Sequence, residues 1–246
     1  MKATFLGTNG WYDTATGSTP CVFIETAERF FVFDAGFGFQ KFRHVETSGK
    51  KIFLFISHLH LDHIIGLHTL PLFRFPQGID ICLPGGMEKI LKNLLKHPFT
   101  AAPLMLQTRI RFRTIDNKTR LPFRLEMKKL RHPVPCYGYR LEDDGKSFAY
   151  CTDTGECANL RRLAANTDLF ITECALAPGD KSPKLFHITP ESAASVALSS
   201  GARKLALCHF DPVKYPSFAE RGQAAAAAKK IFQDTVAAID GAVVEF

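Results

Sequence analysis

The feature that most constrains the fold is an apolar strand that runs directly into a cluster of histidine and aspartate side chains. Residues 51–57 are almost entirely apolar, which is typical of a β-strand covered on both faces. Three histidines and one aspartate follow within six residues: His58, His60, Asp62 and His63. Imidazole nitrogen and carboxylate oxygen suit zinc and related divalent metals. A solvated surface would rarely place so many ligand-type side chains after an apolar strand, so the pattern predicts a metal site.

Four more ligand-type side chains occupy the same position, directly after a strand-like run. They are Asp34, His132, Asp153 and His209, which follow residues 30–33, 125–131, 148–152 and 204–208. Each has an ordinary structural explanation by itself, because aspartate is a common turn former and a single histidine can be a core residue. Together with the cluster at 58–63, they favour one shared metal centre.

Strands and helices alternate along the chain, which predicts helices packed on sheets, an α/β fold. Strands are expected at 3–7, 21–25, 30–34, 52–57, 79–83 and 242–246. Helices are expected at 87–96, 190–200 and 217–234, the second with Thr189 as N-cap and Gly201 as its stop. The segment 97–107 fits neither pattern and is expected to form a loop or lid. With no repeat or linker, we expect one domain over residues 1–246.

Composition adds limits on location and partners. The 31 lysines and arginines exceed the 24 acidic residues, giving a charge of +7, but they are scattered and do not require an anionic partner, although a phosphate ester is compatible. The seven cysteines include no Cys-x-x-Cys pair, which favours free thiols in a reducing compartment. Residues 1–7 lack the apolar core of a signal peptide, and no apolar run reaches the roughly 20 residues that span a bilayer. We therefore expect a cytoplasmic protein with no membrane partner.

The order of the ligand-type side chains resembles the motifs of the metallo-β-lactamase superfamily. That family has an aspartate, then His-x-His-x-Asp-His, then a histidine, an aspartate and a histidine, and the whole series is present here in order. The resemblance extends from Leu6-Gly7-Thr8 to the final strand. It implies an αββα four-layer sandwich with a dinuclear metal site at one edge.

The resemblance also implies a role for each side chain. The first ion would be held by His58, His60 and His132. The second would be held by Asp62, His63 and His209. Asp153 would bridge the ions, and Asp34 would orient a ligand without binding metal. Two divalent ions are thus expected, with zinc favoured and manganese or iron as alternatives.

His187 indicates the branch of the family. It lies in Phe-His-Ile-Thr-Pro-Glu at residues 186–191, 22 residues before His209. This resembles the His-Ser/Thr element of the tRNase Z-like and phosphodiesterase branch, whose histidine supports the transition state or protonates the leaving oxygen. The alternative is that His187 only caps the helix after Thr189. In the catalytic reading, Asp62 and Asp153 hold the ions that activate hydroxide for attack on phosphorus, and His187 assists the leaving group.

His132 and Asp153 are only 21 residues apart. Bacterial-type tRNase Z carries a long tRNA-gripping arm there, so this chain is a poor candidate for pre-tRNA processing. The interval is similar to that of the cyclic-phosphate phosphodiesterase of phosphonate metabolism, whose cysteine-rich structural zinc site has no counterpart here. We therefore favour a phosphodiesterase acting on a small-molecule or nucleotide phosphodiester, with no stable nucleic-acid complex and, by analogy with relatives, a homodimer.

Other functions stay open at this point. An acyl hydrolase of the lactonase, thioesterase or β-lactamase type would use the same hydroxide on a carbonyl, and a tRNA 3′-processing endonuclease is the second alternative. A diiron redox protein is disfavoured because that branch typically has glutamate where His60 stands. A non-catalytic binding protein is disfavoured because no ligand is missing.

Overall fold

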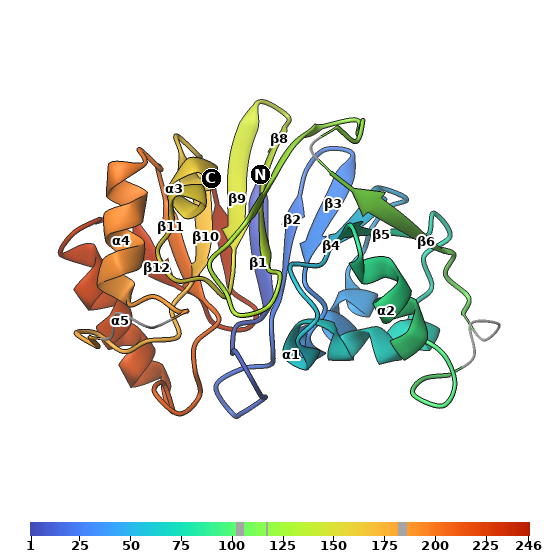
Figure 1. The fold of residues 1–246 in the computed structure, drawn as a ribbon, viewed down its shortest axis with the longest axis horizontal. Coiled ribbons are helices and arrows are strands. Elements are labelled where there is room, and N and C mark those ends of the chain that lie inside the picture. The colour runs from blue at the N-terminus through green and yellow to red at the C-terminus, as the bar shows by residue number, and fades with distance from the viewer. Residues whose placement is uncertain (102–105, 117, 182–185) are drawn as a thin grey trace.

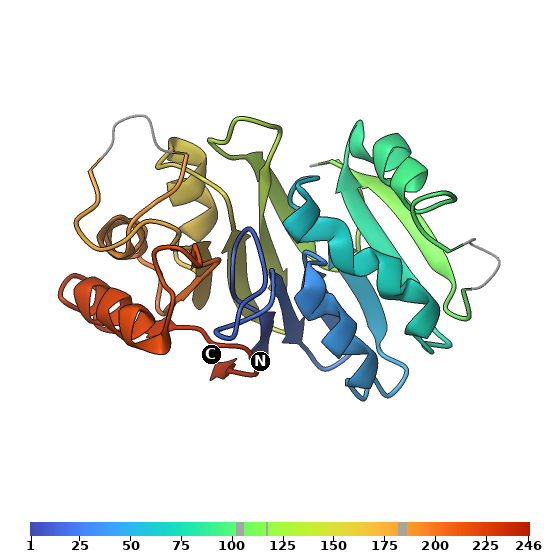
Figure 2. The same ribbon diagram turned by 90° about the horizontal axis from the view of Figure 1, so that it is seen from below.

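Two β-sheets lie face to face, and helices cover the outer face of each, as the ribbon shows (Figure 1). The computed structural model describes residues 1–101, 106–116, 118–181 and 186–246. Turned by 90°, the same four layers follow one another across the molecule (Figure 2). The predicted αββα sandwich is therefore confirmed.

The first sheet has seven strands in the order β13-β1-β2-β3-β4-β5-β6. Its strands are β1 (Lys2–Gly7), β2 (Cys21–Glu25), β3 (Arg29–Phe33), β4 (Lys51–Phe55), β5 (Ile79–Pro84), β6 (Ile110–Ile115) and β13 (Val243–Glu245). The strands from β3 to β6 run parallel to one another. Their carboxyl ends therefore meet at one edge of the sheet.

The second sheet has six strands in the order β12-β11-β10-β9-β8-β7. They are β7 (Arg124–Lys129), β8 (Tyr137–Asp143), β9 (Lys146–Cys151), β10 (Leu169–Glu173), β11 (Leu205–Cys208) and β12 (Thr235–Ala237). The strands from β9 to β12 are parallel, and β8 pairs antiparallel with both β7 and β9. This sheet also gathers several carboxyl ends at one edge.

Helices cover the outer face of each sheet, and the two longest, α4 (Pro190–Ser199) and α5 (Phe218–Lys229), lie on the second (Figure 1). Those on the first sheet are η1 (Phe37–His44), α1 (Leu61–Ile64), η2 (Ile65–Leu72) and α2 (Met87–Leu94). Those on the second are α3 (Ala158–Ala164), α4 and α5. Among the described residues, no helix combines the length and the apolar character needed to cross a membrane.

Three groups of buried side chains fill the spaces between these layers. One lies between the two sheets and joins residues such as Phe33 and Phe55 to Tyr139 and Tyr150. The other two lie between each sheet and its helices. All seven cysteines are free, and six of them are buried, as the apolar context of the thiols predicted. Burying apolar surface on both faces of each sheet stabilises the sandwich and holds the strand ends in place.

The predicted elements are present, with differences of a few residues at their ends. The strand before the histidine cluster ends at Phe55, two residues early, because the Ser57 amide donates a hydrogen bond to the Asp34 carboxylate instead of continuing the ladder. The helix predicted at 190–200 begins after Thr189, whose hydroxyl caps it, and the chain passes through Gly201 at a φ of 68°.

Several elements were not predicted, namely the strands β6, β8, β10 and β12 and the helices η1, α1, η2 and α3. The strand β6 was not predicted, because arginines at positions 111 and 113 interrupt its apolar pattern; both pair with the buried Asp80 of β5. In the segment 97–107, residues 102–105 lie outside the described residues, and the flanking ones form neither helix nor strand. A lid role for this segment stays a prediction.

Candidate metal centre

The carboxyl ends of strands from both sheets bring the predicted ligands to one place. Asp34 and His58 follow β3 and β4 of the first sheet, and Asp153 and His209 follow β9 and β11 of the second. Since parallel strands end at the same edge, side chains that are distant in sequence become neighbours there. The site therefore lies where the edges of the two sheets meet.

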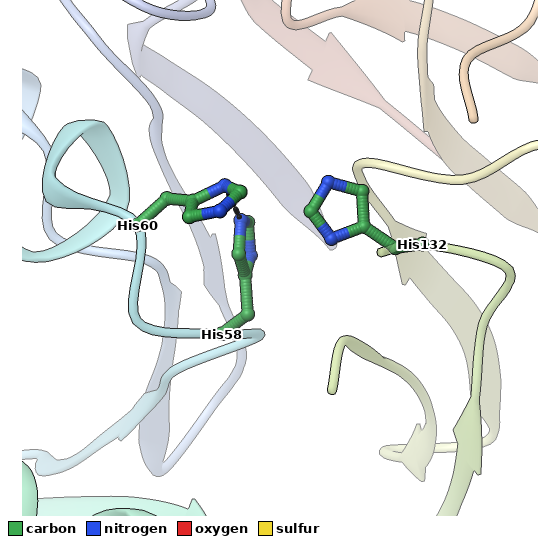
Figure 3. Close-up of side chains that lie close together, drawn as sticks. All are labelled: His58, His60 and His132. Atoms are coloured by element: carbon green, nitrogen blue, oxygen red, sulfur yellow. Dashed lines mark hydrogen bonds between the residues drawn. The ribbon is translucent and has the colours of Figure 1, made fainter. Parts of the chain in front are cut away.

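Three histidines form the first cluster: His58, His60 and His132. The close-up shows their rings turned toward one another, with His132 reaching in from the opposite side (Figure 3). His58 Nε2 lies 3.0 Å from His60 Nδ1, and the ring of His132 is centred 5.0 Å from each of the other two. His58 is fully buried and His60 is exposed, so this cluster has an inner and an open side.

A second cluster is formed by Asp62, His63 and His209, with Asp153 beside it. His63 Nε2 lies 3.3 Å from Asp62 Oδ2, 3.2 Å from His209 Nε2 and 2.8 Å from Asp153 Oδ2. His209 Nε2 lies 3.2 Å from Asp153 Oδ2 and 3.6 Å from Asp62 Oδ2. Asp62, His63 and His209 thus form one group of ligand-type atoms, and Asp153 Oδ2 lies beside two of them.

These separations fit a divalent metal. Ligand atoms bound tetrahedrally at about 2.0–2.1 Å from zinc lie roughly 3.3 Å from one another. The separations in the second cluster lie on either side of that value, from 2.8 Å to 3.6 Å. Asp153 Oδ2 also lies 3.9 Å from His58 Nε2 of the first cluster. The Asp153 carboxylate is therefore placed between the two clusters, where it could contact an ion in each.

The carboxylate of Asp34 contacts the second cluster on the buried side, through His63. It is fully buried and accepts hydrogen bonds from the Ser57 amide at 2.7 Å, the Ser57 hydroxyl at 2.8 Å and the Tyr150 hydroxyl at 2.9 Å. The same carboxylate lies 2.8 Å from His63 Nδ1. This contact fixes the orientation of the imidazole and turns its Nε2 toward the cluster, which is how carboxylates commonly support metal-binding histidines.

Removing this support is expected to weaken metal binding without removing a ligand. We expect Asp34→Ala to lower metal affinity about 10- to 100-fold, because His63 loses its orienting partner. We also expect a loss of roughly 3 kcal/mol or more in the free energy of unfolding, since several buried donors lose their acceptor. Competition with a chromophoric chelator and urea unfolding of the metal-free protein measure the two effects separately.

The matched control is Asp80→Ala. Asp80 is also a buried carboxylate of the first sheet, but its partners are Arg111 and Arg113. This variant is expected to lose stability with an unchanged metal affinity. Equal affinities for Asp34→Ala and Asp80→Ala would contradict the orienting role of Asp34.

Three residues that follow strands at this edge have a left-handed backbone. Asp34, Asp153 and His209 have φ values of 55°, 48° and 52°. This conformation is uncommon outside glycine, although aspartate and histidine adopt it more readily than most residues. It turns the chain sharply out of the strand and aims the side chain across the strand ends instead of along the sheet face.

His187 lies beside both clusters and is held by a buried glutamate. Its Nδ1 is 2.9 Å and 3.1 Å from the two carboxylate oxygens of Glu173 and 3.9 Å from Asp153 Oδ1. The ring is centred 6.2 Å from those of His132 and His209. The cap of α4 is Thr189, which accepts from the Ser192 amide, so His187 does not take the capping position.

Glu173 is a candidate site residue that the sequence did not single out. It is fully buried at the carboxyl end of β10, and it accepts hydrogen bonds from the amides of Thr154, Ala175 and Ile188 as well as contacting His187. Charged side chains are almost never fully buried without partners. The signal available in the sequence was an acidic residue closing an otherwise apolar run, at the same strand-end position as the ligands.

The charges of the site favour a cation. Burial opposes ionisation of Asp153, but the neighbouring His209, His63 and His58 hold the pKa of this carboxyl well below its usual range. Burial lowers the pKa of His58, which favours the neutral imidazole that binds metals. At His63 and His209 burial is outweighed by neighbouring carboxylates, which raise both pKa values, so a bound ion would displace protons from these two rings. The Glu173 carboxylate raises the pKa of His187 to about 9, against the effect of burial. Ionised carboxylates and neutral imidazole are the ligand forms that divalent ions require.

A family model described as a beta-lactamase superfamily domain matches residues 29–210, a span that includes both ligand clusters and His187. This chain belongs to the beta-lactamase superfamily. It is a metal-dependent hydrolase of that superfamily. Ribonuclease Z of Synechocystis sp. is 27% identical, with 86% of this chain and 83% of the relative covered. Ribonuclease BN of Cronobacter sakazakii is 26% identical, with coverages of 85% and 89%. These two relatives are similar to this chain at 26–27% identity, and their names agree with the tRNase Z-like branch that its motifs resemble.

Solved structures of the superfamily share the fold over the whole chain. The metallo-beta-lactamase fold protein YhfI from Bacillus subtilis has a TM-score of 0.81 at 22% identity, covering 100% of this chain and 99% of that one. Human tRNase Z, short form, has a TM-score of 0.74 at 23% identity, with coverages of 100% and 99%. A diphosphatase from the PhnP family has a TM-score of 0.74 at 20% identity, with coverages of 100% and 98%.

Proposed function

We propose that this beta-lactamase superfamily protein is a phosphodiesterase that acts on a small-molecule or nucleotide phosphodiester with two divalent ions, zinc being favoured. The observation that carries the proposal is the position of His187, which Glu173 holds beside the two ligand clusters. When a phosphodiester is hydrolysed, its leaving group departs as an alkoxide that needs a proton. A protonated imidazole beside the ions would supply that proton.

In this proposal each cluster has its own part. His58, His60 and His132 hold one ion. Asp62, His63 and His209 hold the other, with Asp153 shared between them. The bound ions would supply a nucleophile at neutral pH by lowering the pKa of water and would offset the phosphate charge. Asp62 and Asp153 act in catalysis by fixing these positions, and Asp34 keeps His63 aimed at them.

The proton on His187 is kept in place by charge. The Glu173 carboxylate favours the imidazolium form, because the pKa of His187 is raised to about 9, and a contact through Nδ1 leaves Nε2 free to face a substrate. The side chain is 33% exposed, so a bound ester can reach it. A general acid must lie within hydrogen-bond reach of the leaving oxygen, and the position beside both clusters meets that requirement.

The local structure between His132 and Asp153 supports a small substrate. After a short loop, this interval contains only β8, a turn at Asp144 and Gly145, and β9, so no arm extends from it. The alignment with the Synechocystis relative spans 276 positions, more than this whole chain of 246 residues, although it covers 86% of it. The relative therefore has insertions that this chain lacks.

A second candidate function is tRNA 3′-end processing, and the observation that favours it is the set of relatives named ribonuclease Z. A tRNA needs an extended basic surface in addition to a cleavage site, since phosphate contacts supply most of the affinity for nucleic acids. The two functions therefore require substrates of different size. Assays with a small phosphodiester and with a pre-tRNA distinguish them.

We expect the metal-loaded protein to hydrolyse bis-p-nitrophenyl phosphate but not to remove the trailer of a pre-tRNA with a long 3′ extension at physiological salt. The physical reason is the missing arm between His132 and Asp153. Gel analysis of labelled pre-tRNA and release of p-nitrophenol measure the two activities, with nitrocefin and a panel of lactones as acyl substrates. Accurate trailer removal would establish the second candidate, and turnover of an acyl substrate alone would overturn both.

A further inference from the structure

Two large aromatic side chains are exposed next to the metal centre and have no part in the proposed chemistry. Trp11 is 69% exposed and Tyr12 is 42% exposed, on the loop that follows β1. Their rings are centred 5.3 Å apart with planes at 67°, an edge-to-face pair. Neighbouring exposed aromatic side chains next to a candidate active site indicate a binding surface.

The loop that carries these rings is fixed to the second ligand cluster. The Trp11 amide donates a hydrogen bond of 2.9 Å to Asp62 Oδ2. Gly10 packs so closely on His209 that a Cβ atom there would lie 2.5 Å from the imidazole ring, and the Gly10 amide donates to the Phe210 carbonyl. Both ends of the dipeptide Gly10–Trp11 therefore contact the neighbourhood of the proposed ligands.

The loop is also held from below by a buried cation. Arg221 is buried and donates hydrogen bonds to Asn9 Oδ1 and to the hydroxyls of Thr8 and Thr16. Asn9 in turn donates to the carbonyl of Tyr12 at 3.1 Å. These bonds fix the loop backbone, so the exposed rings are mounted on a rigid base and lose little conformational freedom when a ligand binds.

The backbone at Trp11 provides an independent observation. Its φ is 65°, in the left-handed region that bulky residues rarely adopt. Such strain persists only where surrounding contacts enforce it, and it gathers at functional sites. Here the enforcing contact is the hydrogen bond from the Trp11 amide to Asp62. This bond to a proposed metal-binding residue therefore also sets the position of the indole.

We infer that Trp11 and Tyr12 form a stacking platform for the planar base of a nucleotide substrate whose phosphodiester lies at the metal centre. The inference rests on the proposed phosphodiesterase function and narrows its substrate class. In a nucleotide, one sugar separates the base from the phosphate. The aromatic pair is similarly close to the metal centre, because the Trp11 amide is hydrogen-bonded to Asp62, a proposed metal-binding residue. Aromatic rings bind bases of any sequence because every base has a π-face.

The test compares two esters that share one leaving group. The p-nitrophenyl ester of thymidine monophosphate carries a base, and methyl p-nitrophenyl phosphate does not. We expect Trp11→Ala to lower kcat/KM for the nucleotide ester relative to the methyl ester by about 10-fold or more, mainly through KM, because one base–aromatic stack is lost. Trp11→Phe should restore most of the ratio, and Tyr12→Ala should lower it less.

The matched control is Leu198→Ala, which removes a large apolar side chain that is 58% exposed near the end of α4. It should leave the ratio of the two esters unchanged. An equal loss on both esters in Trp11→Ala, or a base-dependent loss in Leu198→Ala, overturns the platform while the proposed function stands. If the wild type hydrolyses neither ester, the proposed function fails and the platform falls with it.

Nucleotide binding at the platform can be measured by fluorescence without hydrolysis, because Trp11 is the only tryptophan in the chain. Thymidine monophosphate should quench its fluorescence at the concentrations that inhibit hydrolysis, and ribose phosphate should not. This measurement uses the wild type, so it does not depend on the folding of any variant. Inhibition by thymidine monophosphate without a change in Trp11 fluorescence would overturn the inference.

Discussion

Asp153→Ala is expected to cost the protein both of its metal ions and at least about 10³-fold in kcat/KM, since metal catalysis supplies several kcal/mol of barrier reduction. The reason is the shared position of the Asp153 carboxylate, whose Oδ2 lies 2.8 Å from His63 Nε2 and 3.9 Å from His58 Nε2. Without this carboxylate, His58, His63 and His209 lose the anion that lies between the two clusters, and neither ion keeps its shared ligand. Elemental analysis of the purified wild type should find close to two equivalents of zinc, manganese or iron per chain.

Two further variants make this result specific. His60→Ala removes a ligand of the first cluster only, so it should lower metal content less than Asp153→Ala. Asp168→Ala removes a carboxylate at the start of β10, at the opposite end from Glu173, where it pairs with Lys146 and Arg203, and should keep its metal. Full occupancy in both Asp153→Ala and His60→Ala would reject the ligand assignment.

His187→Ala should lower kcat by about 10²- to 10⁴-fold on esters with an alkyl leaving group, the usual contribution of general acid catalysis. The loss should be small for p-nitrophenyl esters, because p-nitrophenolate departs without a proton. Metal content should stay near that of the wild type. Rates on an alkyl and a p-nitrophenyl ester, measured with metal content on the same samples, test this expectation.

The role of Glu173 provides the accompanying control. Glu173→Gln keeps the shape of the side chain but removes the charge that favours the imidazolium of His187, so it should reproduce part of the loss and the same dependence on the leaving group. A helix-capping role for His187 predicts a different result, namely a loss of about 1 kcal/mol in stability with unchanged rates. Equal losses on both esters would count against acid catalysis.

The sequence was informative about the site where local pattern and chain order were enough. His58 and His60 follow an apolar strand, and that context placed them at a sheet edge. The strand-end positions of His132, Asp153 and His209 favoured a shared centre, but only the family resemblance divided the side chains between two ions. The structure brings all five side chains together, while their roles as ligands stay predictions.

Other features could not be seen in the sequence because they depend on partners distant along the chain. The burial of Glu173 depends on the amides of Thr154 and Ile188, which lie 19 and 15 residues away. The position of Trp11 depends on Asp62, 51 residues away. The strand β6 was missed because Arg111 and Arg113 are neutralised by Asp80 of a neighbouring strand, a pairing that no local periodicity reveals.

The left-handed backbone at Asp34, Asp153 and His209 has a consequence for protein engineering. Each of these residues holds a conformation that glycine would adopt at lower cost, by roughly 1 kcal/mol per position. At Asp34 the buried hydrogen bonds outweigh this relief, so a screen that selects only for thermal resistance would tend to retain glycine or asparagine at Asp153 and His209, wherever relief of strain exceeds the lost contacts. Such variants would have a higher melting temperature but no hydrolytic activity. Directed evolution of this chain must therefore select for stability and activity together.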